Sequence, residues 1–153
     1  MQKILMVCLG NICRSPLAQG ILESTCKKHN IPIYVDSAGT GNWHSGSPPD
    51  KRSIEIGEKY GIDISHQKAR QFNALDFKKF HKIYVMDTQN YKDIIRLCSN
   101  EEECNKVNLI LNSIDKEKRL SVPDPYYGDQ DGFENIYLLL KSACEQIIKD
   151  IRI

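Results

Sequence analysis

The chain has 153 residues, of which 41% are hydrophobic, and this size and composition suit one domain with one hydrophobic core. Its 21 basic and 20 acidic residues leave a net charge of +1, so no overall basic field would attract nucleic acid or an anionic membrane. No apolar run reaches the length of a membrane span, and the one near the N-terminus is too short for a signal-peptide core. We therefore expect a single cytoplasmic domain over residues 1–153, without stable membrane association and without a nucleic-acid partner.

Short apolar segments alternate with helical patterns along the chain. The apolar segments predict strands at residues 3–7, 33–35, 82–86 and 106–111. The helical patterns lie at residues 15–30, 49–61, 73–80, 88–98 and 133–153. This alternation is typical of an α/β fold in which helices cover both faces of a parallel sheet. Ligands of such sheets bind beyond the carboxyl ends of the strands, where we expect Cys8, Ser37 and Asp87.

The six cysteines follow neither a metal-binding nor a disulfide-rich pattern. No pair has C-x-x-C spacing and no histidine cluster lies near them, so we expect no zinc site. The chain is also long enough to fold without disulfide staples. We therefore expect four of the cysteines to be unpaired thiols, either small buried hydrophobic groups or surface groups: Cys26, Cys98, Cys104 and Cys144.

The segment VCLGNICRSP, residues 7–16, joins the first predicted strand to the first predicted helix. Backbone N–H groups can converge on one point at such a turn, and the helix adds the positive end of its dipole. Gly10 and Asn11 tolerate backbone dihedrals that other residues avoid. Arg14 adds a planar fork that can hold two oxygens of a tetrahedral anion. The segment therefore predicts a phosphate site lined by Leu9, Gly10, Asn11, Ile12 and Cys13.

Cys8 lies where this anion would bind. In the positive field of the turn its thiol is expected to ionise readily, and Ser15 can donate its hydroxyl to the sulfur. A thiolate beneath a bound phosphate ester is placed for in-line attack on phosphorus. The Gly-Lys-Ser/Thr of a Walker loop is absent, which disfavours nucleotide hydrolysis.

A second segment, VPDPYYG, contains a carboxylic acid. Pro123 and Pro125 stiffen the backbone around Asp124 and keep it out of a helix. Release of an alcohol from a phosphate ester needs a proton on the leaving oxygen, and Asp124 can supply it. Tyr126 and Tyr127 follow directly and would suit the wall of a site for an aromatic ring.

Together, VCLGNICRSP and DPYYG resemble the low molecular weight protein tyrosine phosphatases, and VDSAGTGNW, GIDISHQKARQF and VMDTQN extend the resemblance over nearly the whole chain. The resemblance implies a flavodoxin-like fold with a four-stranded parallel sheet. It also implies metal-free and cofactor-free hydrolysis of phosphotyrosine proteins and small aryl phosphates through a phosphocysteine. Inorganic phosphate and other oxyanions are then expected as product or inhibitors.

The resemblance further implies individual roles. Cys8 corresponds to the nucleophile, Arg14 to the phosphate clamp and Asp124 to the general acid. Ser15 corresponds to the hydroxyl that stabilises the thiolate. The supporting positions are Asn11 at the centre of the loop, Ser37 and His66 as its hydrogen-bond partners, and Asp87 as the carboxylate near the arginine. The remaining positions are the substrate rim of Trp43, Tyr126 and Tyr127, and Cys13 as a thiol that can trap Cys8 in a reversible disulfide.

Three alternatives remain open. A thiol-dependent arsenate reductase would need resolving cysteines late in the chain, whereas Cys98 and Cys104 precede the last predicted strand. Phosphoarginine phosphatases resemble this loop but have threonine in place of Ile12, and an apolar side chain there favours a flat aromatic ring. A phosphate-binding or phosphocysteine carrier module would gain nothing from Asp124, which as a general base would promote hydrolysis.

Overall fold

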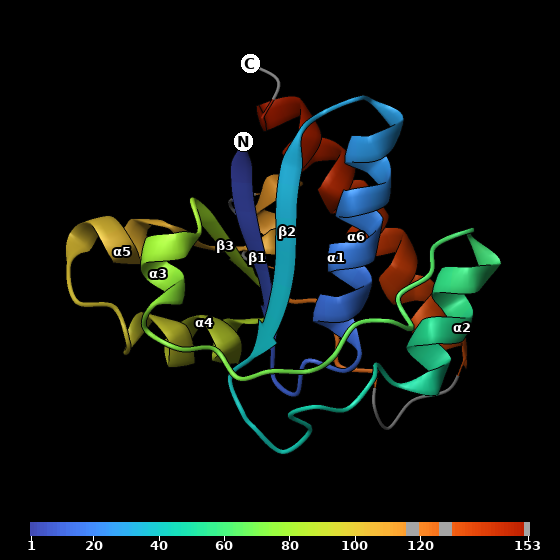
Figure 1. Ribbon diagram of the computed structural model, residues 1–153, viewed down its shortest axis with the longest axis horizontal. Helices are drawn as coiled ribbons and strands as arrows, with labels where there is room; N and C mark the ends of the chain where they lie inside the picture. The colour runs from blue at the N-terminus through green and yellow to red at the C-terminus, as the bar shows by residue number, and fades with distance from the viewer. Residues whose placement is uncertain (116–119, 126–129, 152–153) are drawn as a thin grey trace.

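The computed structural model describes residues 1–115, 120–125 and 130–151 (Figure 1). Its parallel sheet has the strand order β2-β1-β3-β4. The strands are β1 (Gln2–Cys8), β2 (Ile33–Gly39), β3 (Lys82–Val85) and β4 (Val107–Leu109). The helices are α1 (Arg14–Lys28), α2 (Lys51–Lys59), α3 (Asp76–Lys79), α4 (Thr88–Ile95), α5 (Glu101–Asn105) and α6 (Gln130–Ile151), with a 3₁₀ turn, η1 (Ile110–Ser113), after β4.

Helices cover both faces of this sheet, as the sequence predicts. Figure 1 shows α1, α2 and α6 on one side and α3, α4 and α5 on the other. The alternation of side chains along a strand divides β1 between two apolar cores. Ile4 and Met6 pack into the core beneath α1 and α6, whereas Leu5 and Val7 pack into the core beneath α3 and α4. The α/β fold with a four-stranded parallel sheet is therefore confirmed.

No helix among the described residues is both long enough and apolar enough to cross a bilayer.

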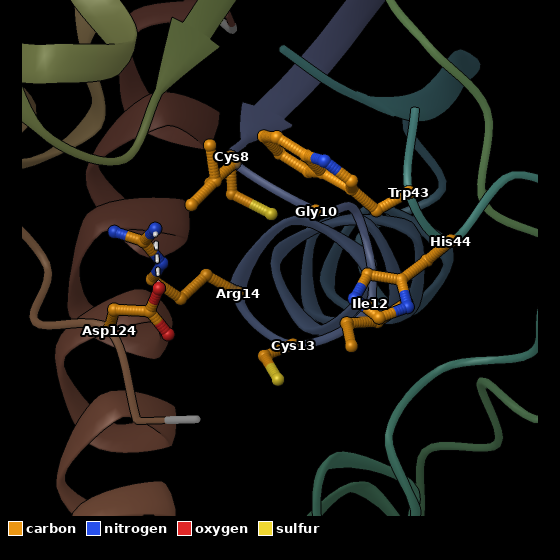
Figure 2. Close-up of a pocket in the computed structure, with 9 residues that line it drawn as sticks. Cys8, Gly10, Ile12, Cys13, Arg14, Trp43, His44 and Asp124 are labelled. Carbon is orange, nitrogen blue, oxygen red and sulfur yellow. Dashed lines mark hydrogen bonds and ion pairs between the residues drawn. The ribbon is translucent and has the colours of Figure 1, made fainter. Parts of the chain in front are cut away.

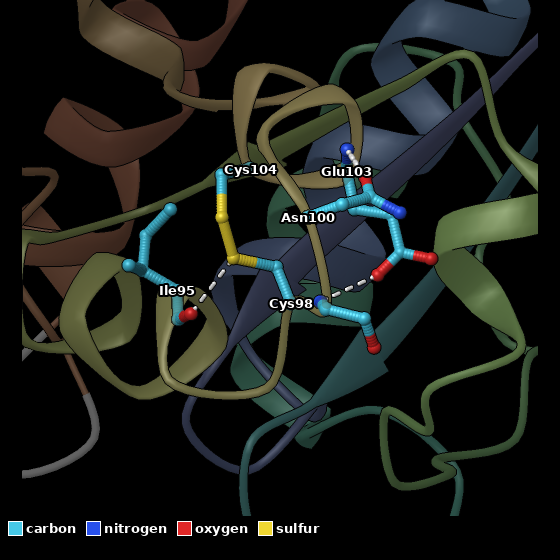
Figure 3. Close-up of a disulfide and its surroundings, with 6 residues drawn as sticks. Ile95, Cys98, Asn100, Glu103 and Cys104 are labelled. Carbon is cyan, nitrogen blue, oxygen red and sulfur yellow. Dashed lines mark hydrogen bonds between the residues drawn. A yellow bond between two sulfur atoms is a disulfide. The ribbon is translucent and has the colours of Figure 1, made fainter.

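The segment between α4 and β4 corrects the prediction that Cys98 and Cys104 are unpaired. The two residues form a disulfide with a Cα–Cα distance of 5.5 Å (Figure 3). Cys26 and Cys144, in contrast, are unpaired and buried, as expected. The spacing of six residues between Cys98 and Cys104 is no recognised signature, so the sequence alone did not indicate this bond.

The same segment contains α5, which was not predicted because its run of acidic residues has no apolar periodicity. The helix is stabilised instead by a reciprocal cap at its start. The Asn100 side chain accepts a hydrogen bond from the Glu103 N–H at 2.8 Å, and the Glu103 carboxylate accepts one from the Ser99 N–H at 2.8 Å. The disulfide joins this capped helix to the segment that follows α4 (Figure 3).

Thiol titration tests the disulfide directly. Because four cysteines are unpaired, we expect four reactive thiols per chain after unfolding without reductant. The disulfide closes a short loop and lowers the conformational entropy of the unfolded chain, which stabilises the folded protein by about 2 kcal/mol. Reductant should therefore lower the melting temperature in scanning calorimetry by about 4–8 °C. A double variant, Cys98→Ala with Cys104→Ala, should melt at this lower temperature and no longer respond to reductant. Six reactive thiols in the wild type would contradict the bond.

Candidate active site

The turn from Cys8, the last residue of β1, to Arg14, the first residue of α1, is called the β1–α1 loop here and comprises residues 9–13. Asn11 adopts a φ of 58°, in the left-handed region that asparagine tolerates better than most residues. In this conformation its backbone N–H donates to the Cys8 Sγ at 3.2 Å. The unusual dihedral thus turns the loop back over the thiol.

The buried side chain of Asn11 holds the loop in place. Its Nδ2 donates to the Ser15 Oγ at 2.8 Å and to the Ser37 Oγ at 2.9 Å. Its Oδ1 accepts a hydrogen bond from the backbone N–H of Arg70 at 3.0 Å. Ser37 is therefore where the resemblance implied. His66 is not: its side chain is exposed, and the Arg70 backbone takes its place.

Two hydrogen bonds converge on the Cys8 sulfur, which is only 2% exposed. One comes from the Asn11 N–H, and the other joins the sulfur to the Ser15 Oγ, 3.0 Å away. Ser15 already accepts a hydrogen bond from Asn11, so its own hydroxyl hydrogen is available to point at the sulfur. Both contacts thus aim a hydrogen-bond donor at the sulfur.

The other unpaired thiols are in environments that keep them protonated. Burial, together with the nearby charge of Asp50, raises the pKa of the Cys13 thiol far above its usual value. Burial raises the pKa of Cys26 to about 11 and that of Cys144 further still. At neutral pH these three cysteines are therefore poor nucleophiles.

The guanidinium of Arg14 is buried, with 2% of the side chain exposed, and neighbouring groups hold it in place. Its Nη1 donates to the Asp87 Oδ2 at 2.7 Å and to the Val122 carbonyl at 2.9 Å. Its Nη2 lies 3.5 Å from the Asp124 Oδ2. Burial alone would lower the pKa of Arg14, but the charges of Cys8, Asp87 and Asp124 outweigh it and raise the pKa. Arg14 therefore remains a cation.

A helix cap and a backbone hydrogen bond place Asp87 and the segment that carries Asp124 beside Arg14. Asp87 caps α4 because its Oδ1 accepts the Asn90 N–H at 2.7 Å, which leaves its other oxygen aimed at Arg14. The Val122 N–H donates to the Met86 carbonyl at 2.7 Å, so the segment that carries Asp124 is fixed to the end of β3. The contribution of Val122 was not predictable because it acts through its backbone alone.

These groups enclose a pocket of about 250 Å³. Figure 2 shows Arg14 and Asp124 on one side of it and Trp43 and His44 on the other, with the Cys8 sulfur between them. Tyr126 and Tyr127, which we expected at the rim, lie outside the described residues. The pocket is lined by Cys8, Leu9, Gly10, Ile12, Cys13, Arg14, Trp43, His44 and Asp124.

Two glycines at the end of β2 shape the mouth of the pocket. A Cβ at Gly39 would come within 2.8 Å of the Leu9 carbonyl oxygen, so only glycine lets β2 approach the loop this closely. A Cβ at Gly41 would come within 2.0 Å of the Trp43 indole. The indole therefore packs directly on the Gly41 backbone, while 71% of the Trp43 residue remains exposed.

The pocket thus brings together a buried cysteine at a strand–helix turn, the arginine that follows it and a carboxylic acid from a distant segment. The family model described as "Low molecular weight phosphotyrosine protein phosphatase" matches residues 3–152, and the chain belongs to this family. The family resemblance drawn from the sequence is thus confirmed.

Individual relatives agree with this assignment. The low molecular weight phosphotyrosine protein phosphatase of Homo sapiens is 37% identical over 150 residues, covering 97% of this chain and 94% of the human protein. A protein tyrosine phosphatase structure from Entamoeba histolytica superposes with a TM-score of 0.93 at 34% identity, covering 99% and 97% of the two chains. A Drosophila arginine phosphatase structure superposes with a TM-score of 0.91 at 30% identity, covering 100% and 99%.

Proposed function

We propose that this protein hydrolyses phosphotyrosine through a phosphocysteine intermediate, with Cys8 as nucleophile, Arg14 as phosphate clamp and Asp124 as general acid and base. The observation that carries the proposal is the position of the Cys8 sulfur. It accepts a hydrogen bond from the Asn11 N–H, lies 3.0 Å from the Ser15 Oγ and shares its pocket with the Arg14 fork and the Asp124 carboxyl group. A nucleophile, an anion clamp and a proton donor thus share one pocket.

In the first step the Cys8 thiolate attacks phosphorus in line with the tyrosyl oxygen. The S–P bond forms, the P–O bond to the ring breaks, and protonated Asp124 donates its proton to the departing oxygen. The N–H groups of the β1–α1 loop and the guanidinium of Arg14 hold the other phosphate oxygens. Because Asp87 and Val122 already anchor Arg14 Nη1, the fork needs little rearrangement as charge develops.

In the second step a water attacks the phosphocysteine. Asp124, now a carboxylate, accepts a proton from this water, the O–P bond forms, and the S–P bond breaks. Cys8 leaves as a thiolate, stabilised by Ser15 and the Asn11 N–H, and inorganic phosphate is released. Both steps therefore need no reactant other than the phosphate ester, the named side chains and water.

The choice of phosphotyrosine rests on the depth and the walls of the pocket. The sulfur is nearly inaccessible, and the broad, exposed indole of Trp43 lies at the mouth. A phosphate on a long flat ring can reach the sulfur while the ring packs on the indole. The high structural similarity to an arginine phosphatase means that the fold does not decide between the two substrates. Ile12, in place of the threonine of phosphoarginine phosphatases, favours the aromatic ring.

Turnover of matched peptides that carry phosphotyrosine, phosphoserine or phosphoarginine tests this proposal. We expect kcat/KM for phosphotyrosine to exceed that for phosphoserine by roughly ten- to a thousandfold, since two or three aromatic contacts of about 0.5–1.5 kcal/mol each would act together. A preference for phosphoarginine would overturn the assignment to tyrosine and leave the phosphatase chemistry standing. Phosphate binding without any turnover would instead indicate a binding module.

Asp124→Asn is expected to slow hydrolysis in proportion to the need of the leaving group for a proton. Phenyl phosphate should lose about 10²–10³-fold in kcat, whereas p-nitrophenyl phosphate should lose much less because nitrophenolate leaves unaided. The measurement is a plot of log kcat against the pKa of the leaving group for both enzymes. Equal losses across the series would remove Asp124 from the role of general acid.

The reversible Cys8–Cys13 disulfide and the cytoplasmic location stay predictions.

A further inference from the structure

A second hollow adjoins the catalytic pocket. It has a volume of about 490 Å³ and shares Leu9 and Trp43 with that pocket, while its far wall includes Leu97, just beyond α4. These three residues are 40%, 71% and 50% exposed, respectively, so the hollow gathers exposed apolar surface at one place. The shared walls make the hollow a continuation of the pocket mouth.

The two charged side chains at this hollow pair with each other. The carboxylate of Asp93 binds the guanidinium of Arg96 and accepts a further hydrogen bond from the Gln89 side chain at 3.0 Å. The amide of Gln71 donates to the Thr40 carbonyl at 3.2 Å. The hollow therefore offers apolar surface with balanced charges at its edge, which suits an apolar side chain better than a charged one.

The two walls of the hollow are also held in place. The Leu97 N–H donates to the Ile94 carbonyl at 2.9 Å, and the next residue, Cys98, is joined to α5 by the disulfide (Figure 3). On the opposite wall the Trp43 indole packs on Gly41. Walls that are ordered before binding lose little conformational entropy when a ligand arrives.

We propose that this hollow, bounded by Leu9, Trp43 and Leu97, binds an apolar side chain of the substrate within two residues of the phosphotyrosine. The inference rests on the proposed function, since a tyrosine ring in the catalytic pocket brings its neighbours in sequence to the mouth. An extended peptide advances about 3.3 Å per residue, so one or two residues carry it past the shared walls of Leu9 and Trp43.

A set of phosphotyrosine peptides tests the proposal, with glycine, leucine, lysine or glutamate placed singly at each of the two positions before and after the phosphotyrosine. At one position or more, leucine should raise kcat/KM about tenfold over glycine. The gain should appear mainly in KM, because the contact is the same before and during the reaction. Turnover of p-nitrophenyl phosphate, which has no neighbouring residue, supplies the baseline.

Leu97→Glu is the matching variant. It should abolish the preference for leucine and raise kcat/KM for the lysine peptide several-fold, with p-nitrophenyl phosphate turnover unchanged. Leu138→Glu is the control, because Leu138 is 49% exposed on α6, which covers the opposite face of the sheet from α4 (Figure 1). This control adds the same charge away from the hollow and should keep the preference for leucine.

The outcomes separate this inference from the proposed function. Normal phosphotyrosine turnover with equal kcat/KM for the leucine and glycine peptides would overturn the apolar subsite alone. A preference for leucine that survives Leu97→Glu, or that Leu138→Glu removes equally, would also overturn it. No turnover of any phosphotyrosine peptide by the wild type would overturn the proposed function itself.

Discussion

Cys8→Ser is expected to abolish turnover while the protein still binds phosphate. A serine hydroxyl is barely ionised at neutral pH, so the attacking group is lost. The β1–α1 loop should keep its shape, because the Asn11 side chain holds it through Ser15, Ser37 and the Arg70 backbone, and these contacts do not involve the sulfur. We expect kcat for p-nitrophenyl phosphate to fall by about 10⁴-fold or more. Isothermal titration with inorganic phosphate should still detect binding.

Cys26→Ala is the control for this experiment. Cys26 is another unpaired and buried thiol, and burial raises its pKa to about 11, but it does not line the pocket. The control should keep kcat even if its melting temperature falls. More than a trace of activity in Cys8→Ser, measured on protein free of wild-type contamination, would assign the nucleophile to another group.

Arg14→Lys should be nearly as damaging as Arg14→Ala, with kcat/KM lower by about 10³-fold or more in both. The guanidinium binds Asp87 and Val122 through Nη1, while its Nη2 faces Asp124 in the pocket. A lysine has a single ammonium group, which cannot keep these anchors and also hold two phosphate oxygens. Steady-state kinetics on p-nitrophenyl phosphate measures the loss, and calorimetry shows whether each variant is folded.

Arg70→Lys is the control, because it makes the same arginine-to-lysine change outside the pocket. Arg70 also forms ion pairs, with Asp36 and Asp76, but it reaches the β1–α1 loop through its backbone N–H, which lysine retains. This variant should keep most of its activity. Near-normal kinetics in Arg14→Lys would show that a point charge suffices and that no forked contact with phosphate is needed.

Local sequence patterns predicted the strands well where their side chains are apolar and buried. They predicted strand ends less well where pairing with a neighbouring strand determines the conformation. β1 and β3 are apolar and buried after their first polar residues, and their positions were predicted to within about two residues. β2 continues to Gly39 through polar and small residues that carry little strand signal, because pairing with β1 holds them extended. The predicted last strand ends early: after Leu109 the chain turns into η1. Its apolar residues are buried in both conformations, so apolar periodicity does not distinguish them.

The candidate site was predictable where side chains carry the chemistry. Cys8 and Arg14 flank one loop, and the structure brings Asp87 and Asp124 beside them from two distant segments. The parts that could not be predicted act through backbone groups or through long-range proximity. The Arg70 N–H supports Asn11 in the place expected for His66, and any residue type would offer the same N–H.

The direction of the chain at its two ends has a practical consequence for handling the protein. β1 runs from Gln2 toward the pocket, and α6 runs the opposite way, so that the last turn of α6 lies at the end of the sheet where β1 starts (Figure 1). Anything joined to either end therefore departs from the side remote from the pocket mouth. An affinity handle, a surface anchor or a fused reporter at either end should leave the pocket open to large phosphoproteins, so the enzyme can be immobilised in one defined orientation.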